Sequence, residues 1–585
     1  MKIRIIIISF FITLLVGSCN TLDYNESTHY EKEDVFYLYQ RTRQFLTNIY
    51  SYVPEYYGRI GNALRSAACD EAVFIDRLSA IHGFNNGTWS AVNALDSRWN
   101  YFEAIRAVNM FLVEIEGRTF EEIKNNYDYK DIMDQFHYFP YEARFLRAYF
   151  YFELAKRYGD IPLITTVLTE EEANRLTRTP FDEVINFIVN ECDAIDEELL
   201  VDYAVDFISL ERGRATKSWA MALKSRALLY AASPLFNSNN DKTKWEKAAK
   251  AAADMIKIAE LTKASLTVDR NKPGYGLGLS FPTLANLWNR NYAQNTELVF
   301  GLLRGTSNSF ESQNYPIGIF GGGTTGHCPS QNLVDAYEMQ ATGLPINAEA
   351  GYQTADPGYD PKNPYVGRDP RLNASIVVNN SVWPTRYAEP VEIWRGGRSG
   401  KPVNYATSTG YYLKKYVDGN IELRPDRTNT NSNHIWNIIR YSEVLLNYAE
   451  AMIEAYGDYN KTSDGDYIFP ISAREAVNKV RARSGVGMPP FPETLSAAEF
   501  KLKLRNERRV ELAFEDHRFW DIRRWKIADQ AKDIYGVDIE KTGDNTFSYT
   551  RVLVESRVFN EKMYLFPIPQ SEVFINPNLR QNQGW

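Results

Sequence analysis

The sequence predicts a mainly α-helical protein, in which a tetratricopeptide-like scaffold of helix-turn-helix pairs carries a loop-rich region with short strands. Two observations lead to this fold class. Several segments repeat small and aromatic side chains at the spacing of a helix, whereas the stretch 271–433 is dense in Gly and Pro and has no such period. The composition, 44% hydrophobic and 24% charged over 585 residues, is typical of a globular chain with a large core.

Residues 141–158 carry one of the clearest helical signals. Phe145, Tyr149 and Phe152 recur at helical spacing, and Gly159 follows as a stop. We therefore expect a helix that ends at Tyr158 and buries its rings.

Three more segments follow the same pattern. Residues 217–233 begin after Thr216, a good N-cap, and end before Pro234, while 440–456 and 473–483 form a second pair. A ring on one helix can fill the space left by an alanine on the next, so such faces stack as repeats. The spacing is not strictly periodic, which predicts tetratricopeptide-like packing without a regular solenoid.

The N-terminus has the layout of a bacterial lipoprotein signal. A short positive region precedes the apolar run 5–16, which is too short to span a bilayer, and small residues stand directly before Cys19. We expect residues 1–18 to be a signal peptide and Cys19 to be the acylated end of the mature chain, held at the membrane by its lipid.

The domain organisation follows from these signals. The mature chain 19–585 is expected to be one unit with a helical scaffold at about 30–270 and 434–530. The loop-rich, ligand-binding part is expected at about 271–433 and a C-terminal segment at 531–585.

Three cysteines remain after Cys19. Cys69, Cys192 and Cys328 are far apart and form no CxxC pair, so they predict neither a disulfide framework nor a zinc site. Buried free thiols are the favoured interpretation, and one long-range bridge stays open.

Several classes of function lack support. A net charge of −8 without a basic block excludes a nucleic-acid partner on electrostatic grounds. The six histidines are not spaced as ligands, and there is no HExxH, GxSxG or complete nucleotide-binding loop. The sequence therefore predicts no metal site and no cofactor, and it contains none of these enzyme motifs.

The segment 505–525 holds the densest group of charges. On a single helix Glu507, Glu511 and Glu515 would fall in one row, which a glycosidase hypothesis could treat as paired carboxylates. The many neighbouring arginines favour a structural ion-pair network instead.

Aromatic residues make up 14% of the chain, more than a core of this size needs, so some rings are expected on the surface. An aromatic face stacks on the C–H face of a sugar ring, while Asp, Asn and Arg beside it select hydroxyl groups. The loop-borne candidates for such platforms are Trp89, Tyr315, Phe320, Trp383, Tyr387 and Trp394, with Arg386 beside two of them.

Short segments along nearly the whole chain resemble the SusD/RagB family of surface glycan-binding lipoproteins. They begin with the lipoprotein start at Cys19 and occur in the family's order. The segments are Cys69-Asp70-Glu71, 99–109, 145–149, 157–163, 329–339, 368–372, 440–451, 505–525 and 565–579.

The resemblance implies an α-rich fold, no catalytic activity, and a place on the outer membrane facing the cell exterior. It also implies a partner, a SusC-like TonB-dependent transporter that receives a captured oligosaccharide. Ligand residues vary within this family, so position and residue type alone select Trp89 with Asp70, and Arg386 with Trp394, as the leading ligand-binding candidates. A surface-anchored glycoside hydrolase and an importer component for peptides or another non-glycan nutrient remain alternatives.

Overall fold

The computed structural model describes residues 31–53, 59–201, 213–261, 277, 279–284, 295–319, 323–347 and 355–585. The predicted signal peptide, the acylation site Cys19 and the candidate ring Phe320 lie outside these residues.

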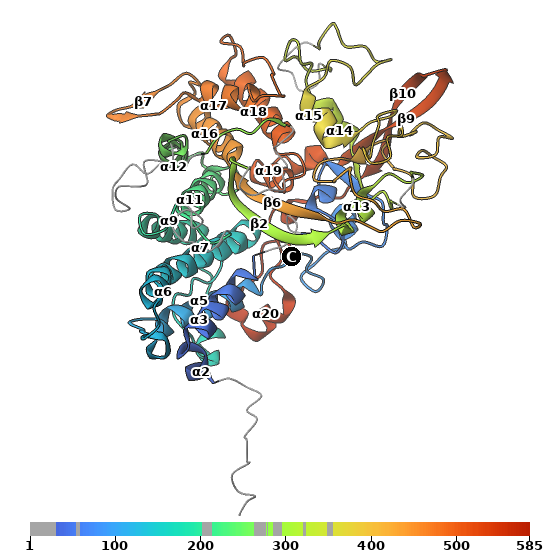
Figure 1. Ribbon diagram of the computed structural model, residues 1–585. Helices are drawn as coiled ribbons and strands as arrows, with labels where there is room; N and C mark the ends of the chain where they lie inside the picture. The colour runs from blue at the N-terminus through green and yellow to red at the C-terminus, as the bar shows by residue number, and fades with distance from the viewer. Residues whose placement is uncertain are drawn as a thin grey trace, which may run out of the picture.

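The described chain is mainly helical, as the sequence predicts, and its longer helices pack side by side in one half of the molecule (Figure 1). They are α2 (Lys32–Phe36), α3 (Tyr39–Tyr50), α5 (Tyr101–Glu114), α6 (Tyr129–Phe136), α7 (Phe139–Tyr158), α9 (Phe181–Ile195), α11 (Lys217–Ala232), α12 (Lys242–Ala259), α16 (Tyr441–Tyr456), α17 (Ala473–Arg481) and α18 (Ala497–Glu511). Short helices are α4 (His82–Asn86), α8 (Glu170–Ala173), α13 (Ser309–Asn314), α14 (Gln331–Ala336), α15 (Pro370–Ser375), α19 (Arg518–Arg524) and α20 (Gln570–Ile575).

In the helical half, each helix of this series packs on a helix that comes later in the chain. Helix α5 packs on α7, α7 on α9, α9 on α11, α11 on α12, α12 on α16, and α16 on α17. Rings on one helix meet rings and small residues on the next, as in the contact of Phe152 with Tyr230 at a centroid distance of 5.2 Å. Gly159 ends α7 with a φ of 72°, a conformation that L side chains rarely adopt. The stacking predicted from the sequence is therefore confirmed.

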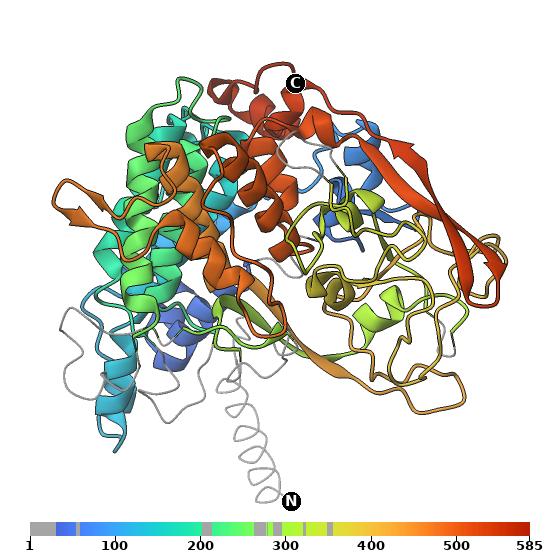
Figure 2. The ribbon, with the colours of Figure 1, turned by 90° about the horizontal axis from the view of Figure 1, so that it is seen from above.

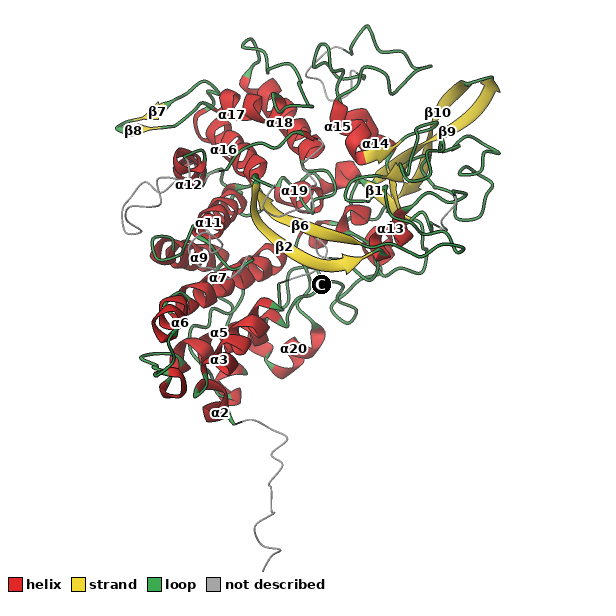
Figure 3. Cartoon of the chain, in the orientation of Figure 1, coloured by secondary structure: helices red, strands yellow, loops and turns green. Residues whose placement is uncertain are grey.

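Strands occur as two-stranded antiparallel pairs (Figure 3). They are β1 (Ala72–Phe74) with β3 (His327–Pro329), β2 (Leu298–Ser307) with β6 (Ser432–Arg440), β4 (Ile376–Val377) with β5 (Tyr412–Leu413), β7 (Ser463–Asp464) with β8 (Tyr467–Ile468), and β9 (Asp533–Gly543) with β10 (Thr546–Ser556). The β2–β6 pair marks both ends of the loop-rich region, and β6 runs directly into α16. That region has its own hydrophobic core, separate from the core of the helices.

The hairpin β9–β10 stands at the side of the molecule away from the helical half (Figure 2). Residues on β10 from Phe547 onward alternate between the two faces of the hairpin, so Phe547, Tyr549 and Arg551 share one face. This hairpin extends the loop-rich region into the C-terminal segment.

The single helix expected over 505–525 is wrong. Helix α18 ends at Glu511 and α19 starts at Arg518, because Phe514 and Asp516 adopt φ values of 61° and 64°, which no helix accommodates. The break allows Glu515 to turn toward Arg440, with a nitrogen–oxygen distance of 2.7 Å.

The prediction about the cysteines can be compared with the structure. Cys69, Cys192 and Cys328 are buried free thiols, which confirms the favoured interpretation and closes the alternative of a bridge among them. Across the described ranges, no helix is long and apolar enough to span a membrane.

Candidate functional site

Trp89 does not form the exposed platform that the sequence predicts. Its side chain is 2% exposed, and its ring contacts Phe84, Phe566 and Trp585 at centroid distances of 4.7, 5.0 and 4.6 Å. Two of these partners lie at the far end of the chain, so nothing in the local sequence reveals the contact. Trp89 joins the C-terminal segment to the helical core.

Asp70 is also buried and has a structural partnership. Its carboxylate lies 2.8 Å from Arg518 Nε and 2.9 Å from a guanidinium nitrogen of Arg509. Burial alone would raise the pKa of Asp70, but the two arginines outweigh it and hold that pKa well below its usual range. Asp70 therefore serves to fix two arginines rather than to face solvent.

Tyr315 and Trp383 are corrected in the same way. Tyr315 is 1% exposed and donates a hydrogen bond of 2.6 Å from its hydroxyl to the Asp418 carbonyl oxygen. Trp383 is 7% exposed and packs so closely on Gly419 that a Cβ there would lie 2.7 Å from the ring. Both rings anchor loops to the core of the loop-rich region.

Arg386 and Trp394 remain accessible. Arg386 is exposed and forms an ion pair with Glu422 at 3.3 Å. Trp394 is half-buried and packs on Phe547 of β10, with centroids 5.2 Å apart. Among the described contacts none joins Arg386 to Trp394, so the structure does not bring this predicted pair together.

Trp394 instead begins a continuous series of rings, which we call the aromatic row. Phe547 is followed by Tyr549 at 6.5 Å, Tyr549 by Tyr365 at 5.5 Å, and Tyr365 by Tyr411 at 6.1 Å. All except Tyr411 are partly exposed. The row crosses from the face of the hairpin to the loops before α15 and after Trp394.

The aromatic row leads into a surface groove made of two adjoining cavities, which share Asp335 and Asn347 as lining residues. One cavity, of about 220 Å³, lies at the tyrosines, and the other, of about 300 Å³, lies over α18 and α19. The first is lined by Gln331, Asp335, Ile346, Asn347, Tyr359, Pro361, Pro364, Tyr365, Tyr411, Val537, Tyr549 and Arg551. The second is lined by Asn332, Asp335, Ala336, Pro345, Asn347, Leu502, Arg505, Asn506, Arg509, Arg518, Trp525, Ile527 and Gln530.

Polar side chains in the first cavity are held by one another. Gln331 accepts a hydrogen bond of 2.6 Å from the Tyr411 hydroxyl and donates one of 2.6 Å to Asp335. Asp335 forms an ion pair with Arg551, whose guanidinium lies 4.2 Å from the ring centroid of Tyr535. The cavity thus combines ring faces with prealigned hydrogen-bonding groups, the combination that sugar recognition requires.

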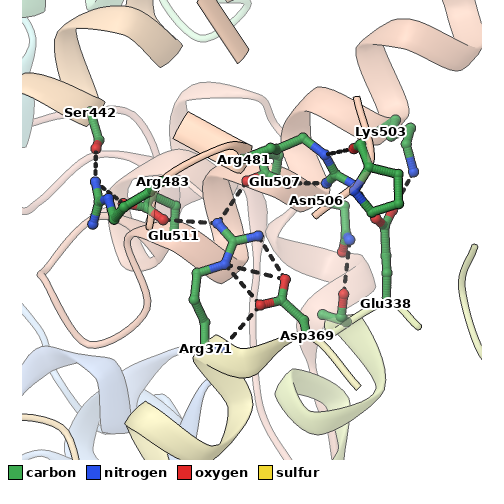
Figure 4. Close-up of polar contacts among 12 residues, drawn as sticks. Glu338, Asp369, Arg371, Ser442, Arg481, Arg483, Lys503, Asn506, Glu507 and Glu511 are labelled. Atoms are coloured by element: carbon green, nitrogen blue, oxygen red, sulfur yellow. Dashed lines mark hydrogen bonds and ion pairs between the residues drawn. The ribbon is translucent and has the colours of Figure 1, made fainter. Parts of the chain in front are cut away.

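A buried ion-pair network joins α15 to α18, the helix that contributes Arg505, Asn506 and Arg509 to the lining of the groove (Figure 4). Arg371 bonds to Glu507 at 2.7 Å and to Glu511 at 2.8 Å, and it is also paired with Asp369. Glu511 and Glu515 both pair with Arg440. These three glutamates are at most 3% exposed, so the network is structural, as the sequence favours, and none of them faces the groove as a free carboxylate.

The sequence reasoning missed most of the aromatic row. Phe547, Tyr549 and Arg551 alternate at strand spacing, which is a usable signal, but Tyr365 and Tyr411 are brought to them only by the fold. Within the described ranges, no group of three or more His, Cys, Asp or Glu could hold a metal ion.

Comparisons with family models, curated proteins and solved structures all identify the same family. A model described as the SusD family matches residues 296–585, and one described as "starch-binding associating with outer membrane" matches residues 23–229. The curated SusD-like protein P25 of Formosa agariphila is 24% identical over 464 residues, which cover 76% of this chain and 72% of that protein.

Solved structures agree over almost the full length. A SusD-like protein of Bacteroides fragilis is 27% identical with a TM-score of 0.73, and the match covers 95% of this chain and 99% of that one. A SusD-like carbohydrate-binding protein of the same organism is 26% identical with a TM-score of 0.67, over 93% and 100% of the two chains. The protein described here therefore belongs to the SusD/RagB family, whose members are described as carbohydrate-binding proteins.

Proposed function

We propose that this protein binds oligosaccharides or polysaccharides at the cell surface and delivers them to a SusC-like TonB-dependent transporter in the outer membrane. The observation that carries the proposal is the aromatic row that leads from Trp394 into the tyrosine-lined cavity. Carbohydrate binding by a similar solved structure supports it.

The spacing of the rings in the row suits a chain of sugar units, although the rings do not form one flat platform. Successive centroids lie 5.2 to 6.5 Å apart, and the planes of Tyr549 and Tyr365 are at 86°, so sugar units of one chain would meet the faces of individual rings at different angles. Hydroxyl groups would then be selected by Gln331, Asp335 and Arg551 at the end of the row, directly or through water. A capture protein must also release its ligand, so micromolar affinity, about −8 kcal/mol, is expected.

Attachment to the outer membrane through acylated Cys19, facing the exterior, is part of the proposal. It rests on the lipoprotein layout of residues 1–19 and on the description of the family model that matches residues 23–229. Globomycin treatment should leave residues 1–18 attached and give a heavier, unprocessed precursor, and Cys19→Ser should abolish acylation and remove the protein from the outer-membrane fraction. Purification of the unaltered protein from outer membranes should recover the transporter with it.

The protein is proposed to carry out no reaction. The carboxylates of Glu507, Glu511 and Glu515 are paired with Arg371 and Arg440. The glycosidase hypothesis relied on two of these carboxylates as catalytic groups, and it is left without them. Calorimetry against a panel of starch, fructan, mucin and hemicellulose oligosaccharides tests binding. Assay of reducing ends after incubation with the same panel tests catalysis, and none should appear.

A further inference from the structure

The second cavity of the groove is basic, although the whole chain carries a net charge of −8. The guanidinium groups of Arg505, Arg509 and Arg518 line it, and Arg551 stands at the neighbouring cavity. Their carboxylate partners are Asp70, which pairs with Arg509 and Arg518, and Asp335, which pairs with Arg551. Four guanidinium groups against two carboxylates leave a local charge of +2.

Arg505 is the one of these four arginines that has no carboxylate partner among the described residues. No carboxylate of the described residues lies within ion-pair distance of it, and its guanidinium instead lies 4.8 Å from the ring centroid of Trp525. Trp525 is itself fixed by a hydrogen bond of 2.7 Å from its indole nitrogen to Glu450. Arg505 is therefore held in place by an aromatic ring, and among the described residues its hydrogen-bond donors have no partner, which preorganises it for a planar oxyanion.

Arg509 adds positive charge to the wall of the cavity, although its Nε is too buried to contact a ligand. Its Nε is buried and has no hydrogen-bond partner among the described residues, because Asp70 engages the terminal nitrogen. Glu71, the next acid along the chain, does not supply the missing charge: burial and the neighbouring Asp70 raise its pKa to about 8. A positively charged cavity with walls of low dielectric attracts anions more strongly than the same charges on an open surface would.

We infer that the ligand of this groove is an acidic glycan, and that Arg505 binds its charged group while the aromatic row binds its sugar rings. This inference rests on the proposed function and narrows its substrate class. A uronate carboxylate and a sulfate ester share the chemistry that a guanidinium fork recognises, namely two oxygens carrying one negative charge.

The test is calorimetry on the full mature chain with pairs of oligosaccharides of equal length. Tetragalacturonate represents the uronates and a chondroitin sulfate tetrasaccharide the sulfate esters, with maltotetraose and cellotetraose as neutral counterparts. We expect at least one acidic ligand to bind about tenfold more tightly than the neutral ones, and its affinity to fall as NaCl is raised from 50 to 500 mM.

Single substitutions test whether Arg505 is responsible for the preference for acidic ligands. Arg505→Gln should weaken the acidic ligand about tenfold and leave neutral ligands within twofold, whereas Arg505→Lys should recover part of the loss because it restores charge without the planar fork. Arg395→Gln, at an exposed guanidinium paired with Asp538, is the matched control and should change neither. Thermal unfolding of each variant shows whether the fold is intact.

Three results separate the two claims. If neutral ligands bind as tightly as acidic ones, or Arg505→Gln weakens both classes equally, the inference about acidic glycans is overturned and the proposed function stands. If none of these oligosaccharides nor any member of the wider glycan panel binds, both are overturned. If only the sulfated or only the uronate ligand responds to Arg505→Gln, the inference holds and the anion is identified.

Discussion

Tyr365 and Tyr549 meet edge to face, with their ring centroids 5.5 Å apart and their planes at 86°. The first ring belongs to a loop of the loop-rich region and the second to the hairpin β9–β10, so this contact joins two parts of the chain that are far apart in sequence. It also makes the aromatic row continuous at the entrance of the groove. The function proposed for the surface depends on this connection.

Replacement of Trp89 tests whether that ring belongs to the core. Trp89→Ala should lower the free energy of unfolding by about 3–5 kcal/mol, because the ring is 2% exposed and packs on three other rings. Urea denaturation measures the change. Trp394→Ala, at a half-buried ring, should cost about 1–2 kcal/mol and serves as the comparison.

Glycan affinity, measured on a second Trp89 variant, tests whether Trp89 also contacts the ligand. The conservative variant Trp89→Phe, which keeps a ring in the core, should bind glycans within twofold of the unaltered protein. A large loss of affinity in Trp89→Phe with unchanged stability would restore Trp89 as a ligand residue.

Arg371 should be one of the most costly positions in the ion-pair network. Arg371→Ala leaves Asp369, Glu507 and Glu511 short of a partner in a buried site, so we expect a loss of about 3–5 kcal/mol in unfolding free energy. Arg395→Ala breaks a solvent-exposed pair with Asp538 and should cost less than about 1 kcal/mol. Equal effects of the two variants in guanidinium chloride titrations would show that burial of the network contributes little.

The raised pKa of Glu71 predicts that the stability of the protein falls as the pH rises. Burial, followed by the charge of Asp70, raises the pKa of Glu71 to about 8 from the ordinary 4.5, so the folded protein holds a proton that the unfolded chain releases between these values. The stability that this proton confers is fully present below about pH 4.5 and is lost as the pH rises through about 8.

Glu71→Gln keeps the shape of the protonated side chain and has no proton to lose. Its stability relative to the unaltered protein should therefore increase between pH 5 and pH 8, by at most about 1.4 kcal/mol for each pH unit. Glu561→Gln, at a carboxyl that is 77% exposed, is the control. A difference between Glu71→Gln and the unaltered protein that stays constant with pH would mean that Glu71 is ionised in the folded state.

The sequence predicts the helices well and the site poorly, for physical reasons that particular residues make clear. Helix α7 is set by rings at helical spacing and by Gly159 directly after it, so local signals suffice. Trp89 looks like a loop-borne platform because the residues that cover it, Phe566 and Trp585, are separated from it by most of the chain. Ring exposure depends on such distant contacts.

The break between α18 and α19 shows a different limit. The segment 505–525 has helical composition throughout, yet Phe514 and Asp516 adopt left-handed conformations, and the break lets Glu515 pair with Arg440. The break coincides with tertiary ion pairs between distant residues, which helix propensity does not describe. The many arginines in this segment did predict correctly that Glu507, Glu511 and Glu515 would belong to a structural ion-pair network.

The most direct test of the account is the affinity of Tyr549→Ala for a glycan that the unaltered protein binds, measured by calorimetry. Tyr549 lies in the middle of the aromatic row, and loss of this ring should weaken binding about tenfold, while stability falls by about 1–2 kcal/mol, as for Trp394→Ala, and the protein stays folded. Thr550→Ala, on the opposite face of the same strand, should bind normally. Unchanged affinity in Tyr549→Ala and in the double variant with Trp394→Ala would contradict the claim that this surface binds carbohydrate.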